Sequence, residues 1–168
     1  VLQDVGAQAN TLFNTEKLFV VGIALVIAGM GFKISLVPFH CWAPDVYQGA
    51  ATPVTTFMSA GVKLASFIAL LRIFMYAETL DSSKVSDVMQ WLSAITMIGG
   101  SLAALRQENI KRMLAYSSIA HSGFAMMGLV ASSFGSSAGE GGISLLFYLL
   151  TYSLMTIGTF AVVSVLEN

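Results

Sequence analysis

Lys33-Ile-Ser-Leu-Val-Pro-Phe-His-Cys-Trp-Ala-Pro-Asp-Val-Tyr-Gln-Gly-Ala50 is a stretch that interrupts an apolar run beginning at Leu18. Proline has no backbone N–H and clashes with the preceding helical turn, so Pro38 and Pro44 are expected to kink or break a helix. In hydrocarbon, a broken backbone is tolerated only where it packs against protein or lines a wet cavity. Because discontinuous helices recur where transporters hold ions, this stretch predicts an ion-handling membrane subunit.

The composition excludes an ordinary soluble domain. Of the 168 residues, 56% are hydrophobic and 10% are charged, whereas a soluble domain carries about 25% charged residues. The net charge of −1 provides no basic surface for nucleic acid. The single cysteine, Cys41, has no partner for an internal disulfide and no CxxC context, so it predicts neither a metal nor a redox site. The expected solvent is a lipid bilayer.

The apolar runs predict an all-α membrane protein, a polytopic transmembrane helix bundle with one discontinuous helix. Residues 1–17 are expected to form an interfacial loop or a short helix, and 18–168 a single transmembrane domain. Basic residues gather between Arg106 and Arg112, so the positive-inside rule places that loop in the cytoplasm. The spans are expected at about 18–50 (broken near Pro38), 54–77, 88–105, 113–135 and 143–166.

Lys63 is the strongest candidate for chemistry, because it lies inside the second span. It is nine residues after Val54 and fourteen before Ala77, which at ~1.5 Å per residue is about 13 Å from the nearer boundary. A lysine stem does not easily reach water over that distance, and a charge at mid-bilayer costs about 2.5–3.5 kcal/mol. The amine is expected to handle protons; the alternative is a lysine in a fixed ion pair.

Hydroxyl groups accompany Lys63 along its helix. Thr56, Ser59 and Ser66 recur with Lys63 at spacings of three or four residues, which places them on one helix face. Such a polar lining can hold a chain of water molecules. It can equally serve helix packing through small polar residues, and the spacing does not separate the two.

Two further ionisable residues are candidates for the same path. His121 lies in the fourth span with Ser118 and Ser122 on its side, and histidine exchanges protons near neutral pH. The alternative is a neutral histidine satisfied by one hydroxyl. Lys33 lies near mid-membrane if the break at Pro38 is within the bilayer, and it is an ordinary interfacial lysine if the break is at the surface.

Other polar groups are interpreted as structural. Pro44-Asp45 suits the start of a helix, because proline fits the first turn and the helix dipole stabilises an acid there. The stripe of Tyr148, Tyr152, Thr156 and Thr159 is interpreted as a polar packing seam. The sequence has no dinucleotide fingerprint, no cysteine cluster and no histidine pair for haem, so neither bound NADH nor any cofactor is expected in this chain.

Two long motif blocks carry a resemblance to a known family. Residues 32–54 contain Val-Pro-Phe-His-Cys-Trp-Ala-Pro-Asp-Val-Tyr-Gln-Gly-Ala, and residues 107–123 run from Gln-Glu-Asn-Ile-Lys-Arg to Ala-His-Ser-Gly. Both resemble the antiporter-like membrane subunits of respiratory complex I, as does the last span. The form Pro-Asp-Val-Tyr-Gln-Gly is similar to the subunit N branch, the bacterial counterpart of mitochondrial NADH dehydrogenase subunit 2. Ala51 departs from the proline common in the family.

The resemblance implies a fragment covering about helices 7–11 of a fourteen-helix, inverted-repeat subunit. It implies that Lys33, Lys63 and His121 belong to a proton path. It further implies a proton-translocating membrane-arm subunit of NADH:quinone oxidoreductase in the bacterial inner membrane, coupled to quinone reduction elsewhere. The implied partners are the other membrane-arm subunits and the lipid bilayer, with flavin, iron–sulfur clusters and quinone in partner subunits.

Two other functions stay open. The chain could be part of a sodium/proton antiporter complex, although the Pro-Asp-Val-Tyr-Gln-Gly motif disfavours this. It could also be a membrane scaffold that moves no ion, although a scaffold gains nothing from a costly amine at mid-bilayer.

Overall fold

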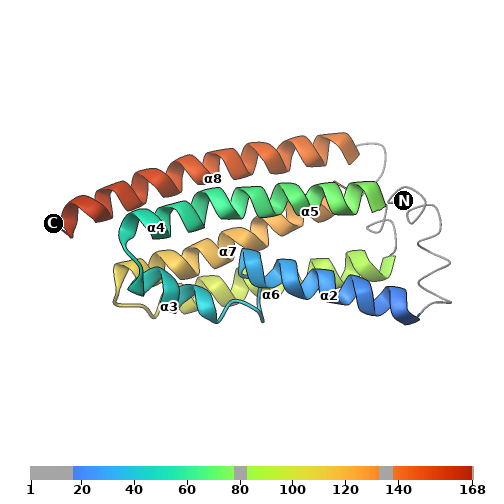
Figure 1. Ribbon diagram of the computed structural model, residues 1–168, viewed down its shortest axis with the longest axis horizontal. Coiled ribbons are helices and arrows are strands. Elements are labelled where there is room, and N and C mark those ends of the chain that lie inside the picture. Colours follow the sequence, from blue (N-terminus) through green and yellow to red (C-terminus); the bar gives the residue numbers. More distant parts are fainter. Residues whose placement is uncertain (1–16, 78–82, 133–137, 168) are drawn as a thin grey trace.

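The computed structural model describes residues 17–77, 83–132 and 138–167, and all regular structure in these ranges is helical (Figure 1). The predicted all-α fold class is therefore confirmed for this part of the chain. The predicted loop or short helix at 1–17 lies outside it, apart from Lys17. The elements are α2 (Lys17–Ile34), α3 (Trp42–Gly49), α4 (Thr52–Phe57), the π-helix η1 (Met58–Val62), α5 (Lys63–Ala77), α6 (Ser83–Ala104), α7 (Ile110–Ala131) and α8 (Ala138–Leu166).

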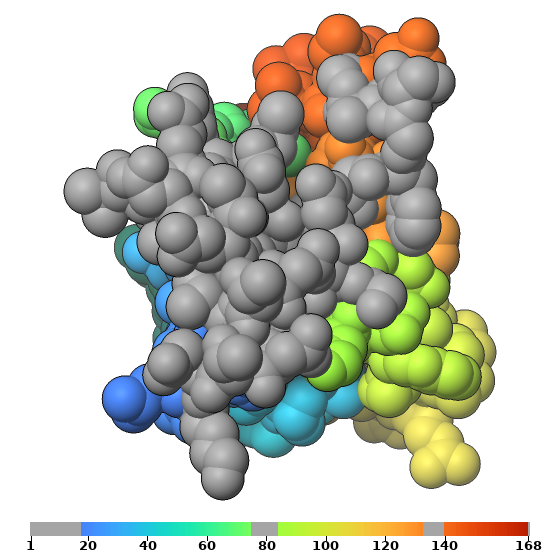
Figure 2. All heavy atoms as spheres, turned by 90° about the vertical axis from the view of Figure 1, so that its right-hand side faces the viewer, coloured from blue at the N-terminus to red at the C-terminus, as the bar shows by residue number. Residues whose placement is uncertain are grey.

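The long helices lie side by side and alternate in direction (Figure 1). After a break, α3 continues in the direction of α2, and α4, η1 and α5 then return as one uninterrupted helical segment. α6, α7 and α8 follow in alternating directions. Seen from the side and from one end, α2 and α8 lie on opposite sides of the bundle (Figures 1 and 2). This arrangement puts α7 between the broken helix and α8.

The helices overlap all five predicted apolar runs, and each begins one to five residues earlier. α6 begins at Ser83 rather than Val88, and α8 at Ala138 rather than Ile143, because an apolar run leaves out the polar first turn of a helix. Residues 133–135 of the fourth run lie outside the described ranges. By length and composition, Thr52–Phe74, Ile110–Ala131 and Glu140–Leu166 are able to cross a membrane, and Leu18–Ile34 is a shorter apolar helix. The five-span topology stays a prediction.

Small residues let α6 and α7 approach closely. A β-carbon added at Gly123 would lie 2.9 Å from both the backbone nitrogen of Met97 and the carbonyl oxygen of Ser93. A β-carbon added at Gly100 would lie 2.7 Å from the backbone nitrogen of Ala120. The Ser93 hydroxyl donates a hydrogen bond of 2.8 Å to the Gly123 carbonyl. Close backbone packing and interhelical hydrogen bonds are what hold helices together in lipid, where apolar burial adds little.

Gly123→Ala is expected to destabilise the protein by about 1–3 kcal/mol, because the new methyl group meets backbone that moves only if α6 and α7 separate. Gly29→Ala and Gly158→Ala are matched controls, since nothing lies within 4 Å of a β-carbon at either position. The thermal unfolding midpoint of the full-length subunit in detergent should fall for Gly123→Ala relative to both controls. Equal midpoints in all three variants would contradict the close α6–α7 contact.

Candidate functional site

The break between α2 and α3 is held by polar groups on two neighbouring helices. The carbonyl of Ile34, the last residue of α2, accepts a hydrogen bond of 2.7 Å from the Ser122 hydroxyl on α7. The Val37 N–H donates a hydrogen bond of 3.1 Å to the Thr96 hydroxyl on α6. Backbone groups released by the break thus find partners inside the protein, which is the condition for irregular backbone at membrane depth.

The two prolines near the break have different places. Pro38 lies in the turn between α2 and α3. Pro44 does not break a helix, because it lies with Asp45 in the first turn of α3, where a missing N–H is tolerated. This position agrees with the predicted helix start and corrects the prediction of a second break. Ser35 has a φ of 61°, a left-handed conformation unusual for a side-chain-bearing residue, and its buried hydroxyl has no described hydrogen-bond partner.

Lys63 is buried, and the contacts described for its amine are all with neutral groups. It directly follows the π-helix η1, a kind of helical irregularity that is frequent at functional sites. Its side chain is 3% exposed. The amine nitrogen, Nζ, donates to the Ser118 carbonyl oxygen at 2.6 Å and to the Ser118 hydroxyl at 2.5 Å. Among the described residues no carboxylate pairs with this amine, so the alternative of a fixed ion pair finds no support in them.

Ser118 connects Lys63 to two other helices. Its hydroxyl oxygen accepts a hydrogen bond of 2.8 Å from the Tyr152 hydroxyl on α8. Its carbonyl oxygen lies 3.1 Å from the Ser122 hydroxyl, whose single proton is shared between this carbonyl and that of Ile34. Through Ser122 the Lys63 amine is thus linked to the carbonyl of Ile34 at the break.

His121 lies close to the Lys63 cluster but makes its own contacts. It is half-buried on α7, and its Nδ1 lies 2.6 Å from the Tyr148 hydroxyl oxygen. The ring centroids of His121 and Tyr152 are 5.0 Å apart. Lys63 Nζ is 5.7 Å from the centroid of the Tyr152 ring, within cation–π range. The Tyr152 ring is therefore the shared neighbour of the amine and the imidazole.

Lys33 is not joined to this cluster. Its side chain is exposed, and it has no hydrogen-bond or ion-pair partner among the residues that the structure describes. It lines a cavity of about 390 Å³ between α2 and the η1–α5 segment, and Ser66 lines the same cavity. The structure therefore brings Lys33 to Ser66 and its neighbours, and not into contact with Lys63.

The remaining hydroxyls of the predicted polar lining bind their own helical segment. Thr56 donates to the Thr52 carbonyl at 2.8 Å, and Ser66 donates to the Val62 carbonyl at 2.7 Å. Ser59, which is fully buried, donates to the Thr56 carbonyl at 3.1 Å. These hydrogen bonds leave oxygen lone pairs able to accept hydrogen bonds from water.

Ion pairs gather where α3, α4, α7 and α8 meet. Arg112, in the first turns of α7, pairs with Asp45 of α3 at 2.8 Å. Lys111 pairs with Glu167 at 3.2 Å, and the Thr52 hydroxyl also donates to Glu167. Hydrogen bonds from Thr52 and then from Lys111 hold the pKa of the exposed Glu167 carboxyl below its ordinary value. These contacts tie the basic end of α7 to the corner between α3 and α4.

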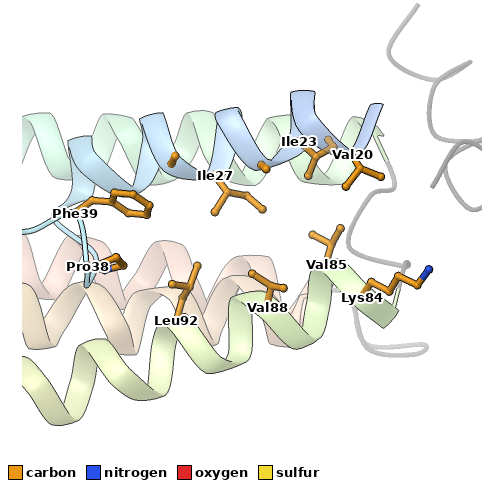
Figure 3. Close-up of a pocket in the computed structure, with 11 residues that line it drawn as sticks. Val20, Ile23, Ile27, Pro38, Phe39, Lys84, Val85, Val88 and Leu92 are labelled. Carbon is orange, nitrogen blue, oxygen red and sulfur yellow. The ribbon is translucent and has the colours of Figure 1, made fainter. Parts of the chain in front are cut away.

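A further cavity, among the described residues, lies apart from the Lys63 cluster. This cavity of about 530 Å³ lies between α2 and α6 and is lined mainly by apolar side chains such as Ile23, Ile27 and Val88 (Figure 3). Lys84 lies at one end of it, with its amine directed away from the apolar side chains. The cavity offers no polar groups along its length that would hold an ion.

Comparisons with known proteins identify the family. The model of the NADH:quinone oxidoreductase/Mrp antiporter transmembrane family matches residues 2–168. The chain belongs to this family. NADH-quinone oxidoreductase subunit N of Bdellovibrio bacteriovorus is 49% identical over 160 residues, which are 95% of this chain and 33% of the relative. NADH-quinone oxidoreductase subunit N 3 of Streptomyces griseus is 47% identical over 168 residues, which are 100% of this chain and 29% of the relative.

Two solved structures have a similar fold. A chain of respiratory complex I from Thermus thermophilus matches with a TM-score of 0.71 and 37% identity, over 95% of this chain and 38% of that one. A chain of the Mrp complex from Dietzia matches with a TM-score of 0.83 over 99% of this chain and 29% of that one, and at 23% identity it supports the fold alone. The predicted resemblance is confirmed. The chain spans about a third of the length of the curated relatives it matches.

Sequence reasoning named Ser118 but missed the two tyrosines beside Lys63 and His121. It interpreted Tyr148 and Tyr152 as a packing seam, yet Tyr152 contacts both Ser118 and the Lys63 amine, and Tyr148 contacts His121. The four-residue spacing of the tyrosines placed them on one face, but nothing in the sequence said which helix that face meets. Thr96 was missed because one threonine in an apolar run carries no pattern.

Ser118→Ala is expected to destabilise the protein by about 1.5–3 kcal/mol, because it removes a hydrogen bond to an amine and leaves the Tyr152 hydroxyl without its acceptor. In a Lys63→Met background the same substitution should cost less, since the amine is already gone. Chemical unfolding of the full-length subunit in detergent measures the cycle. Ser153→Ala is the control, because among the described residues its hydroxyl bonds within α8, to the Leu149 carbonyl. Equal costs in both backgrounds would contradict the Lys63–Ser118 contact.

Proposed function

We propose that this chain is part of a proton-translocating membrane-arm subunit of NADH:quinone oxidoreductase, respiratory complex I. In this proposal, protons move along a buried axis of lysines, and their movement is coupled to quinone reduction elsewhere in the complex. The observation that carries the proposal is the Lys63 amine, 3% exposed and surrounded by a carbonyl, hydroxyls and an aromatic ring.

The neutral surroundings of Lys63 suit a group that gains and loses a proton. If a buried carboxylate were paired with the amine, deprotonation would leave an uncompensated charge in a low-dielectric interior, at a cost of several kcal/mol. Carbonyl and hydroxyl oxygens stabilise the protonated amine, and the Ser118 hydroxyl can also donate to the neutral amine. The amine therefore has hydrogen-bond partners in either protonation state, and its deprotonation leaves no charge behind at the site.

Lys33, His121 and the polar lining complete the proposed path. The cavity shared by Lys33 and Ser66 supports a wet region on the η1–α5 segment next to Lys63. On the other side, the Tyr152 ring adjoins both Lys63 and His121. We assign proton exchange to Lys33 and Lys63, and a relay to His121. The lining role goes to Thr56, Ser59, Ser66, Ser118 and Ser122.

The setting of the subunit follows from its relatives. Curated relatives at 46–49% identity are named NADH-quinone oxidoreductase subunit N. We therefore propose a bacterial inner membrane location, with the loop from Arg106 to Arg112 in the cytoplasm and other membrane-arm subunits as partners. NADH, flavin, iron–sulfur clusters and quinone belong to partner subunits in this proposal, and NADH is not bound by this chain.

Lys63→Met in the intact complex is expected to abolish most proton pumping per NADH, because methionine fills the space of the stem but has no protonatable group. The measurement is the number of protons moved per NADH in proteoliposomes, beside NADH:quinone activity with an uncoupler present. Lys84→Met, which removes an exposed lysine near the start of α6, is the control and should pump normally.

Normal pumping by assembled Lys63→Met complex would make Lys63 a structural charge. If Lys33→Met/Lys63→Met double mutants also pumped normally, the scaffold function would replace the proposed one. If pumping by the unmodified complex required sodium and moved it, the antiporter function would be favoured instead.

Lys33→Met is expected to lower pumping less than Lys63→Met, because Lys33 faces an open cavity where water can substitute in part for the amine. If both lysines serve one path, the double mutant should pump no less than Lys63→Met alone. A double mutant with a clearly larger loss than Lys63→Met, measured as protons per NADH, would place the two lysines on separate paths.

A further inference from the structure

A small cavity between α7 and α8 borders the Lys63 cluster. Its volume is about 30 Å³. The other lining side chains are apolar, so the hydroxyls form its only polar wall among the described residues. Those hydroxyls belong to Ser117 and Ser118 on α7 and to Tyr152, Thr156 and Thr159 on α8.

The cavity has the size and the chemistry of a water site. A buried water needs about 10–15 Å³ of such space and two to four polar partners, so this cavity has room for one or two waters. Tyr152 donates its hydroxyl proton to Ser118, and Thr159 donates to the Met155 carbonyl at 2.9 Å. Their oxygens can still accept hydrogen bonds from water, because a hydroxyl oxygen has two lone pairs.

The hydroxyls lead in one direction along α8. Thr156 and Thr159 follow Tyr152 by four and seven residues, which is about 6 and 10 Å toward Leu166 at ~1.5 Å per residue. That is the end of the bundle where Lys111 pairs with Glu167. Tyr148 and His121 lie to the opposite side of Tyr152, so they belong to a different branch.

We propose that ordered water in this cavity forms a proton branch that reaches Lys63 through Ser118, with Tyr152 and Thr156 holding the water. A proton passes from the water to Ser118 Oγ as the existing Ser118 O–H proton passes to the neutral Lys63 amine. The water regains a proton from its neighbour on the α8 side, so the hydroxyls are unchanged after each transfer. The role in pumping rests on the proposed function, whereas the presence of the water does not.

Two variants and one direct observation test the branch in the intact complex. Ser117→Leu fills the cavity, and Thr156→Val removes a hydroxyl at nearly constant volume. Each is expected to lower protons per NADH by at least about twofold while uncoupled NADH:quinone activity stays normal, because a water wire fails when its water or a partner is lost. Cryo-electron microscopy at a resolution that shows ordered water should find density in the unmodified cavity and none in Ser117→Leu.

Thr151→Val is the matched control. Thr151 donates to the Phe147 carbonyl at 2.9 Å, as Thr159 does to Met155, but it is exposed on α8. This variant should pump normally.

Two results would overturn the branch and leave the proposed function standing. One is an empty cavity in the unmodified complex. The other is full pumping by both test variants when Lys63→Met does not pump. If Ser117→Leu fails to assemble, Thr156→Val and the density in the unmodified complex decide. Normal pumping by Lys63→Met would instead overturn the proposed function, and the density would still decide the water site.

Discussion

A bilayer offers no hydrogen-bond partner to a backbone N–H or C=O, and the rest of the structure depends on how this constraint is met at the break between α2 and α3. The Ile34 carbonyl finds the Ser122 hydroxyl on α7, and the Val37 N–H finds the Thr96 hydroxyl on α6. Both partners reach the break only if α6 and α7 lie at a fixed distance from each other. The glycine-mediated contact between these two helices sets that distance. The hydrogen bonds at the break therefore hold α2, α6 and α7 together.

The same hydrogen bonds link the break to the buried amine. Ser122 contacts both the Ile34 carbonyl and the Ser118 carbonyl, and Ser118 holds Lys63. A shift of the α2 end would change the hydrogen bonding of Ser122 and, through it, the electron-rich carbonyl that stabilises the protonated amine. The π-helix directly before Lys63 is a second local irregularity at the same place. Structural support and the proposed proton chemistry thus share residues, which gives a physical route by which movement at the break would change the charge on Lys63.

The helices and the candidate residue Lys63 could be predicted from the sequence, while the contacts between helices could not. Pro38 located the break, and a charge inside a long apolar run singled out Lys63. Both features can be recognised from the order of residues alone, without knowing which helices pack together. The helix starts differed by up to five residues, since polar first turns hide the ends of helices. Pro44 was misjudged as a break because its tolerance depends on being in a first turn. The contact of Tyr152 with Ser118 joins residues 34 positions apart, and no periodicity within one helix reveals which neighbour its polar face meets.

In the proposed function, the Lys63 amine changes its protonation state during turnover. Infrared difference spectroscopy of the intact complex with ¹⁵N-labelled lysine, triggered by NADH, tests this most directly. We expect an isotope-sensitive ammonium band that changes during turnover and is missing from the Lys63→Met complex. Identical difference spectra from the two complexes would show that this amine keeps one protonation state throughout, and the proton path would have to run elsewhere.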